Sequence, residues 1–206
     1  MGNLVKVVQA EPLAMQILVA GTSVVSAVIN VATMWNARIF FDAAFLTNVG
    51  SASPARMEVQ VSEKDSGNDT WVVAQERIVA KVNGGNSFAL TAAVTAGDFV
   101  FSTVNPVWAV PLGPQYLFIR DPVFGSSEWN RLLSRSGTAT TMSDAFTSSH
   151  VITTTLVYRA WRTTFAMDLS SVRRLRIAFY NTNTVDAHAP ADCAIRVAMI
   201  ATDSLS

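Results

Sequence analysis

Alternation of apolar and polar residues with a period of two is the feature that most constrains the fold of this chain. Successive side chains of a β-strand point to opposite faces, so residues two positions apart share a face. The stretches RRLRIAFYN, CAIRVAMIA and MEVQVS show this alternation. Their apolar members are Leu175, Ile177, Phe179, Ile195, Val197, Met199, Met57, Val59 and Val61. The pattern predicts strands that bury one face in a core.

A polar loop, EKDSGND, separates two apolar ribbons, since MEVQVS precedes it and TWVVAQERIVAKV follows it. Asp, Ser, Gly and Asn adopt turn conformations that strand residues disfavour, so the stretch predicts a β-hairpin with an exposed loop. Trp71 stands directly after the turn. We expect it to be a core anchor that buries on the order of 200 Å². A role in stacking on a base or a sugar is the alternative.

Short strand-like stretches recur along most of the chain, and few stretches have helical spacing. Consecutive short strands with few helices are typical of an antiparallel β-sandwich. We therefore expect residues 1–206 to form a single all-β domain, an antiparallel sandwich of jelly-roll type.

Two segments are expected to lie outside the regular strands. Residues 1–15 contain Pro12 and show little periodicity, so they are predicted to form an extended N-terminal arm or an edge strand. Residues 103–126 are predicted to form a crossover, because a proline cannot donate a hydrogen bond within a central strand. The prolines of this second segment are Pro106, Pro111, Pro114 and Pro122.

One short helix is predicted in the stretch SSEWNRLLSRSG. Ser127, Leu132 and Leu133 have helical spacing, and Ser126 or Ser127 is a suitable N-terminal cap. The helix is expected to end near Gly137.

The composition favours packing against other proteins. Charged residues make up 15% of the chain, hydrophobic residues 50%, and the formal net charge is zero. Ordinary domains contain about 25% charged residues. Nucleic-acid binding depends on clustered Lys and Arg, and the only dense cluster, Arg173, Arg174 and Arg176, lies in a strand-like stretch. A protein partner is therefore expected, and nucleic acid is not.

The segment from Pro12 to Ala37 contains no charged residue, so a membrane-spanning helix has to be considered. Polar residues interrupt it every few positions, and its Val and Thr content favours strands. We expect strands here, a mature soluble chain and no membrane partner.

No reactive site is expected from the cysteine and histidine content. Cys193 is the only cysteine, which excludes an intrachain disulfide and a thiolate metal site. His150 and His188 are the only histidines, and zinc signatures need more His or Cys at short spacing. A catalytic Cys193 beside His188 is the alternative to a packed thiol, although sequence proximity is not the geometry that activates a thiolate.

Carboxylates offer two further alternatives. Asp168 and Asp186 are conceivable as an acid–base pair, although nothing in their spacing brings them together. The loop residues Asp65, Asn68 and Asp69 offer oxygen ligands for calcium, and a plain turn is favoured over such a site. We therefore expect a protein without cofactor, metal or catalytic residues, one that acts by binding and not as an enzyme.

Two stretches resemble β-sandwich structural proteins of tailed bacteriophages. One is the hairpin with Val61, Ser62, Lys64 and the run SGNDTW, and the other is the closing stretch RRLRIAFYNTNTVDAHAPADCAIRVAMIATDSL. Together they cover about a fifth of the chain. The resemblance implies a virion structural protein at the capsid surface. Specifically, it implies a decoration (cement) protein that binds the major capsid protein as an oligomer, commonly a trimer, and stabilises the shell.

The hairpin is also similar to the V-x-x-S-x-D-G-x-x-W hairpin of galactose-binding-like jelly rolls. Here Asp65, Ser66 and Gly67 stand where that pattern has Asp-Gly. This second similarity implies a carbohydrate-binding module as the alternative function. A structural role in a phage tail or fibre is a further alternative.

An oligomer on a shell needs apolar interface area, roughly 800 Å² per partner. Aromatic residues near proline-rich loops are suited to supply it. Trp108 and Tyr116, together with Pro12 in the arm, are therefore the predicted interface residues.

Overall fold

The computed structural model describes residues 6–19, 21–46, 55–67, 70–79, 87–103, 116–152, 154–181 and 192–203. Strands account for 65% of these residues, and the only other regular element among them is one 3-10 turn, η1 (Phe124–Ser126). The predicted all-β class is confirmed. The strands are β1 (Lys6–Leu18), β2 (Ser23–Val25), β3 (Ile29–Asn30), β4 (Met34–Phe45), β5 (Ala55–Ser62), β6 (Val72–Val79), β7 (Phe88–Ala89), β8 (Val100–Ser102), β9 (Tyr116–Arg120), β10 (Glu128–Ser136), β11 (Ala139–Met142), β12 (Leu156–Asp168), β13 (Arg174–Tyr180) and β14 (Cys193–Asp203).

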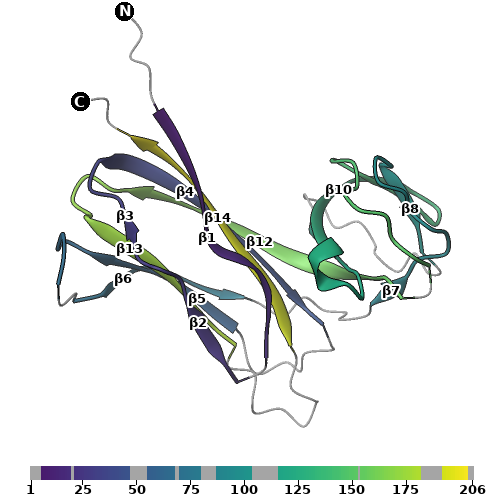
Figure 1. Ribbon diagram of the computed structural model, residues 1–206, viewed down its shortest axis with the longest axis horizontal. Helices are drawn as coiled ribbons and strands as arrows, with labels where there is room; N and C mark the ends of the chain where they lie inside the picture. The colour runs from purple at the N-terminus through teal and green to yellow at the C-terminus, as the bar shows by residue number, and fades with distance from the viewer. Residues whose placement is uncertain are drawn as a thin grey trace, which may run out of the picture. The chain divides into compact units, whose positions relative to one another are not determined.

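The strands form two sheets (Figure 1). The larger sheet has the order β1-β14-β4-β12-β9-β10-β11-β8, with β7 paired to β12. The smaller sheet has the order β2-β13-β5-β6, with β3 paired to β13. The β1–β14, β5–β6, β5–β13, β9–β10, β9–β12 and β10–β11 pairs are antiparallel.

The chain divides into two compact units, and the first comprises Met1–Ala43, Val49–Lys81 and Arg162–Ser206. In this unit β4 of the larger sheet contacts β13 of the smaller sheet. The ring centres of Phe41 and Phe179 lie 5.2 Å apart, and both side chains are fully buried. The alternation predicted from the sequence is confirmed around this contact. The predicted core residues that are buried are Leu175, Ile177, Phe179, Ile195, Val197, Met199, Met57 and Val59.

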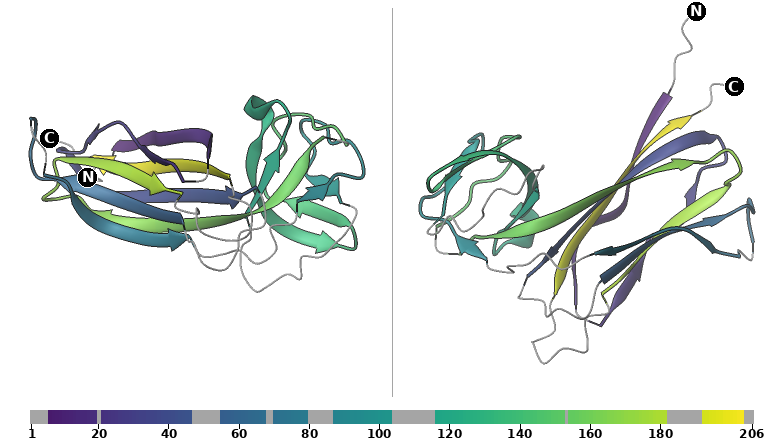
Figure 2. Two further views of the ribbon diagram at one scale, coloured as in Figure 1. Left: turned by 90° about the horizontal axis from the view of Figure 1, so that it is seen from below. Right: turned by 180° about the vertical axis from the view of Figure 1, so that it is seen from behind.

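The second unit comprises Ala44–Asn48 and Val82–Trp161. Its strands, β7 to β11 and the first part of β12, curl around a core of their own (Figure 2). Strands β7, β8, β9, β11 and β12 each contribute apolar residues to this core. The core residues are Phe88, Leu90, Val94, Phe101, Leu117, Ile119, Met142, Phe146 and Val157.

The predicted helix in SSEWNRLLSRSG is wrong, because this stretch forms β10, paired with β9 and β11. Asn130 and Leu132 are buried two positions apart, whereas Leu133 is exposed, which is strand periodicity. The Ser127 hydroxyl caps no helix but accepts a hydrogen bond from the Asp121 N–H at 2.9 Å. Gly137 has a positive φ of 58° and lies in the hairpin turn between β10 and β11.

The expected arm is largely an edge strand. From Lys6 onward the segment pairs with β14 as the end strand of the larger sheet, and residues 1–5 lie outside the described part. Pro12 lies within a register shift between Ala10 and Leu13, where its missing N–H breaks no regular pairing.

The expected crossover, residues 103–126, contains a strand, β9. Residues 104–115, with Trp108 and three of the four prolines, lie outside the described residues. The described residues of the segment from Pro12 to Ala37 lie in strands β1 to β4 and their connections, as predicted. Within the described part, no helix has the length and apolar character needed to cross a membrane.

Candidate functional site

The three predicted interface residues, Pro12, Trp108 and Tyr116, stay a prediction. Pro12 is half-buried on β1 of the first unit, and Tyr116 is half-buried at the start of β9 in the second. Trp108 lies outside the described residues.

A different surface, on the smaller sheet, combines arginines with aromatic rings. Arg56 lies opposite Tyr180, and Gln60 lies opposite Arg176, in the β5–β13 register. Directly opposed residues share a face, and this face is turned away from the core that Leu175 and Ile177 fill. We name it the arginine face, made of Arg56, Glu58, Gln60, Trp71, Arg176 and Tyr180.

Each of two guanidinium groups on the arginine face stacks on an aromatic ring. The Arg56 guanidinium carbon lies 4.8 Å from the centre of the Tyr180 ring, and that of Arg176 lies 4.3 Å from the Trp71 ring. Trp71 is half-buried. It is therefore not the core anchor that we predicted, but the platform for a cation on the outside of the sheet.

Buried polar side chains of β5 hold these arginines in place. Arg176 Nε donates to Gln60 Oε1 at 2.7 Å, and Gln60 Nε2 donates to Glu58 Oε2 at 2.7 Å. Arg56 Nη2 lies 3.1 Å from Glu58 Oε1. Glu58 is 5% and Gln60 8% exposed, so the polar side of the alternating strand is covered too. These contacts with Glu58 and Gln60 hold both guanidinium groups in place in the unbound protein.

Exposed apolar side chains surround the arginine face. Ile78 lies opposite Arg56, and Val73 lies opposite Gln60, in the β5–β6 register. Val25 of β2 lies opposite Ala178 of β13, which in turn pairs with Glu58. Ile78 is 54% exposed, and Val73 and Val25 are each 45% exposed. Arg and aromatic residues beside apolar ones are typical of protein interfaces.

A second cluster lies on the larger sheet of the same unit. Asp42 of β4 is 1% exposed and accepts hydrogen bonds from two arginines. Arg162 Nε donates to Oδ1, and Arg162 Nη2 donates to Oδ2 at 2.6 Å. Arg196 donates to Oδ2 from Nε at 3.2 Å and from Nη2 at 2.9 Å. One buried carboxylate thus orients two guanidinium groups.

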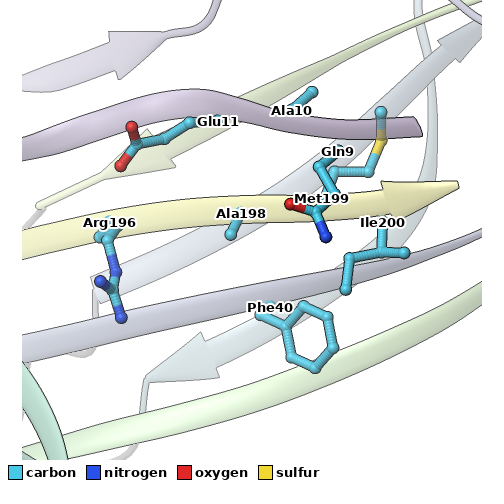
Figure 3. A pocket seen from close by; sticks show the side chains of 8 residues that line it. All are labelled: Gln9, Ala10, Glu11, Phe40, Arg196, Ala198, Met199 and Ile200. Carbon is cyan, nitrogen blue, oxygen red and sulfur yellow. The ribbon is translucent and has the colours of Figure 1, made fainter. Parts of the chain in front are cut away.

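Arg196 also lines a hollow of about 430 Å³ (Figure 3). The hollow is formed by β1, β4 and β14, and its lining includes Gln9, Glu11, Phe40, Ala198 and Ile200. Figure 3 shows Glu11 and Arg196 toward one end of the hollow and Phe40 and Ile200 toward the other, with Ala198 between them.

A third cluster, in the second unit, surrounds His150. Its Nδ1 lies 3.1 Å from Asp121 Oδ2, and its Nε2 lies 2.8 Å from Glu128 Oε1. Both ring nitrogens are therefore held by carboxylates, and the side chain is fully buried. Burial alone raises the pKa of Asp121, but hydrogen bonds from His150 and the Val123 N–H outweigh it and hold this pKa below its ordinary value. Because both ring nitrogens are occupied and the side chain is buried, the cluster is suited to joining the segments around Asp121, Glu128 and His150. It is not suited to exchanging a proton with a ligand.

The remaining candidates for chemistry are placed as follows. Cys193 is fully buried in β14, as a packed thiol would be. Asp168 is exposed, and the Ser170 N–H that it binds lowers its pKa. Asp65 is exposed in the hairpin loop. Asn68, Asp69, Asp186 and His188 lie outside the described residues. Among the described residues, no three His, Cys, Asp or Glu side chains form a group that could hold a metal ion.

Sequence reasoning missed all three clusters. It noted Arg176 only as part of a basic cluster and His150 only as one of two histidines. Asp42 is 120 positions from Arg162, and no local spacing signals such a pair. The one available signal was Asp42, a carboxylate within the strongly apolar stretch IFFDAAF.

No protein-family model matches the chain, and no curated protein matches it either.

Proposed function

We propose that this chain is a structural protein of a tailed-bacteriophage particle, a decoration protein that binds the outer capsid as an oligomer and stabilises it. The observation that carries the proposal is the arginine face. It joins two ring-stacked arginines to an exposed apolar border of Val25, Val73 and Ile78 on a chain with few charges. Such a surface is suited to permanent contact with protein.

The fixed geometry of the arginine face favours binding. Ordering a long side chain at an interface costs about 0.5–1.5 kcal/mol. Arg56 and Arg176 are already held by Glu58, Gln60 and two rings, so less of this cost remains. Two cations above one buried carboxylate favour an acidic partner surface. We assign that surface to the major capsid protein.

The fold that accompanies this proposal is a β-sandwich in the first unit. The contact between Phe41 and Phe179 joins the two sheets there, and arrangement in two layers is how sheets with one apolar face bury it. A jelly-roll-like course of the chain and a trimeric assembly belong to the same proposal. The resemblance of the hairpin and the closing strands to phage sandwiches supports both.

The first experiment is to purify particles from the native source on a gradient and quantify this chain against the major shell protein by mass spectrometry. We expect co-sedimentation at a fixed ratio, in hundreds of copies per particle. A few tens of copies would place the chain in the tail, a fibre or a vertex. Recovery only in the supernatant would refute the virion role.

A second experiment tests the surface itself. Particles stripped of the chain are mixed with the purified protein or with Arg56→Glu/Arg176→Glu, and bound protein is measured after sedimentation. We expect the double variant to lose binding. Arg38→Glu is the matched control, because Arg38 is exposed on β4 and outside the arginine face. Equal binding of the folded double variant would exclude this face as the docking surface.

A carbohydrate-binding module is the second candidate function. The specific observation in its favour is the hollow beside Arg196, which has an aromatic ring and three polar side chains in its lining.

A further inference from the structure

We propose that the hollow between β1, β4 and β14 is a binding site for a neutral pyranose sugar. The inference rests on the second candidate function, carbohydrate binding, and names its site and ligand class. The site is separate from the arginine face, and it does not depend on a role in a particle. Its volume of about 430 Å³ is within the range of small-ligand sites, roughly 300–1,000 Å³.

The hollow exists because a small residue stands between larger ones. Ala198 of β14 contributes only a methyl group, whereas Glu11 on β1 and Phe40 on β4 rise beside it (Figure 3). Met199 is 1% exposed, so the strand is anchored in the core beneath the hollow. The depression is therefore part of the folded sheet and does not need a ligand to form.

The polar lining excludes a simple ion as the preferred ligand. Arg196 supplies a cation, Glu11 an anion and Gln9 an amide. A strongly charged anion would be opposed by Glu11, and a cation by Arg196. A neutral group that both donates and accepts hydrogen bonds satisfies all three side chains. Hydroxyl groups have this property, so the lining favours a ligand with several hydroxyls.

The apolar lining selects a ring among such ligands. Phe40 is half-buried, and Ile200 is 38% exposed at the same end of the hollow. A pyranose has equatorial hydroxyls at its edge and a flat C–H face that packs on such side chains. A flexible open-chain polyol has the hydroxyls without that face.

The guanidinium group of Arg196 is already oriented for this task. Two hydrogen bonds to the buried Asp42 fix it, while 30% of the side chain stays exposed. A donor fixed before binding loses less entropy on contact with a ligand. Asp42 is thus a positioning residue for the site, and it does not line the hollow.

The test is saturation-transfer NMR on the full chain with glucose, galactose and mannose as separate probes and sorbitol as the open-chain control. We expect saturable transfer to the ring protons of at least one hexose, with a Kd in the millimolar range, and a weaker signal from sorbitol. Ala198→Leu, which fills the hollow, and Glu11→Ala should each weaken binding at least about tenfold. Ala166→Leu is the matched control, because Ala166 is exposed on β12 and does not line the hollow.

Three results would overturn the proposal: no saturable transfer from any of the three hexoses, equal transfer from sorbitol, or binding that Ala198→Leu leaves unchanged. Circular dichroism of each variant confirms that it is folded. None of these results bears on particle binding, which is measured by sedimentation.

Discussion

The imidazole of His150 lies 2.8 Å from a carboxylate oxygen of Glu128, at the first residue of β10. The other ring nitrogen contacts Asp121, which directly follows β9. Glu128 also accepts hydrogen bonds from the backbone N–H groups of Thr147 and Ser148. A single buried side chain thus joins the ends of two strands to the segment that precedes β12.

Replacing His150 by leucine should destabilise the protein strongly. Removing one partner of a buried charged cluster typically costs about 3–5 kcal/mol, because the remaining charges stay buried without it. Urea unfolding followed by circular dichroism measures the change. Val151→Ala is the control, since Val151 is the exposed neighbour and should change the free energy of unfolding by less than about 0.5 kcal/mol. A loss below about 1 kcal/mol for His150→Leu would contradict the structural role.

Asp121 predicts a dependence of stability on pH. Its pKa in the folded protein lies below the ordinary value of 3.8, so the folded state binds this proton more weakly than the unfolded state. The resulting stabilisation is complete above pH 3.8 and is lost as pH falls from there through the folded-state pKa. The difference in unfolding free energy between the protein and Asp121→Asn should therefore shrink below pH 3.8. Urea unfolding at a series of pH values measures this, and a difference that stays constant or grows would contradict it.

Asp42 is predicted to be essential for the stability of the first unit. Asp42→Ala leaves Arg162 and Arg196 partly buried without their common carboxylate, and a loss of about 3–5 kcal/mol is expected. Arg38→Met, at an exposed position on the same strand, is the control. The double variant Asp42→Ala/Arg196→Met should recover part of the loss, because one uncompensated charge is removed with it. Additive losses in the double variant would show that the two residues do not interact.

The strands of this fold were predictable because their period is local. The apolar–polar alternation around residues such as Ile177 and Val197 is enough to predict which face of the strand is buried. The turn residues between β5 and β6 are enough to predict that hairpin. The helix prediction failed because Ser127, Leu132 and Leu133 fit a helical spacing, whereas the stretch pairs with β9 and β11 as a strand. Leu132 is buried in it, and Leu133, which lies at a register shift, is 60% exposed. The pairing partners in β9 and β11 determine that this stretch is a strand, and a local sequence pattern carries no information about those partners.

The candidate sites were less predictable than the strands. Arg176 meets Gln60 across 116 positions, and His150 meets Asp121 across 29, so only the folded register brings them together. Trp71 was expected in the core because large aromatic residues usually contribute there. Trp71 directly precedes β6, at the beginning of that strand, and the side chain that covers its ring there is Arg176.

Trp71 and Phe179 should therefore differ in what they contribute to stability. Phe179→Ala opens a cavity in the core of the first unit and should cost about 3–5 kcal/mol. Trp71→Ala removes a half-buried ring and one contact between a cation and a ring, which is worth about 0.5–1 kcal/mol at such a site, so a total loss of about 1–2 kcal/mol is expected. Trp35, 65% exposed, is the control, and Trp35→Ala should change stability by less than about 0.5 kcal/mol. If urea unfolding gives Trp71→Ala as large a loss as Phe179→Ala, then Trp71 is a core residue after all and the arginine face lacks one of its two platforms.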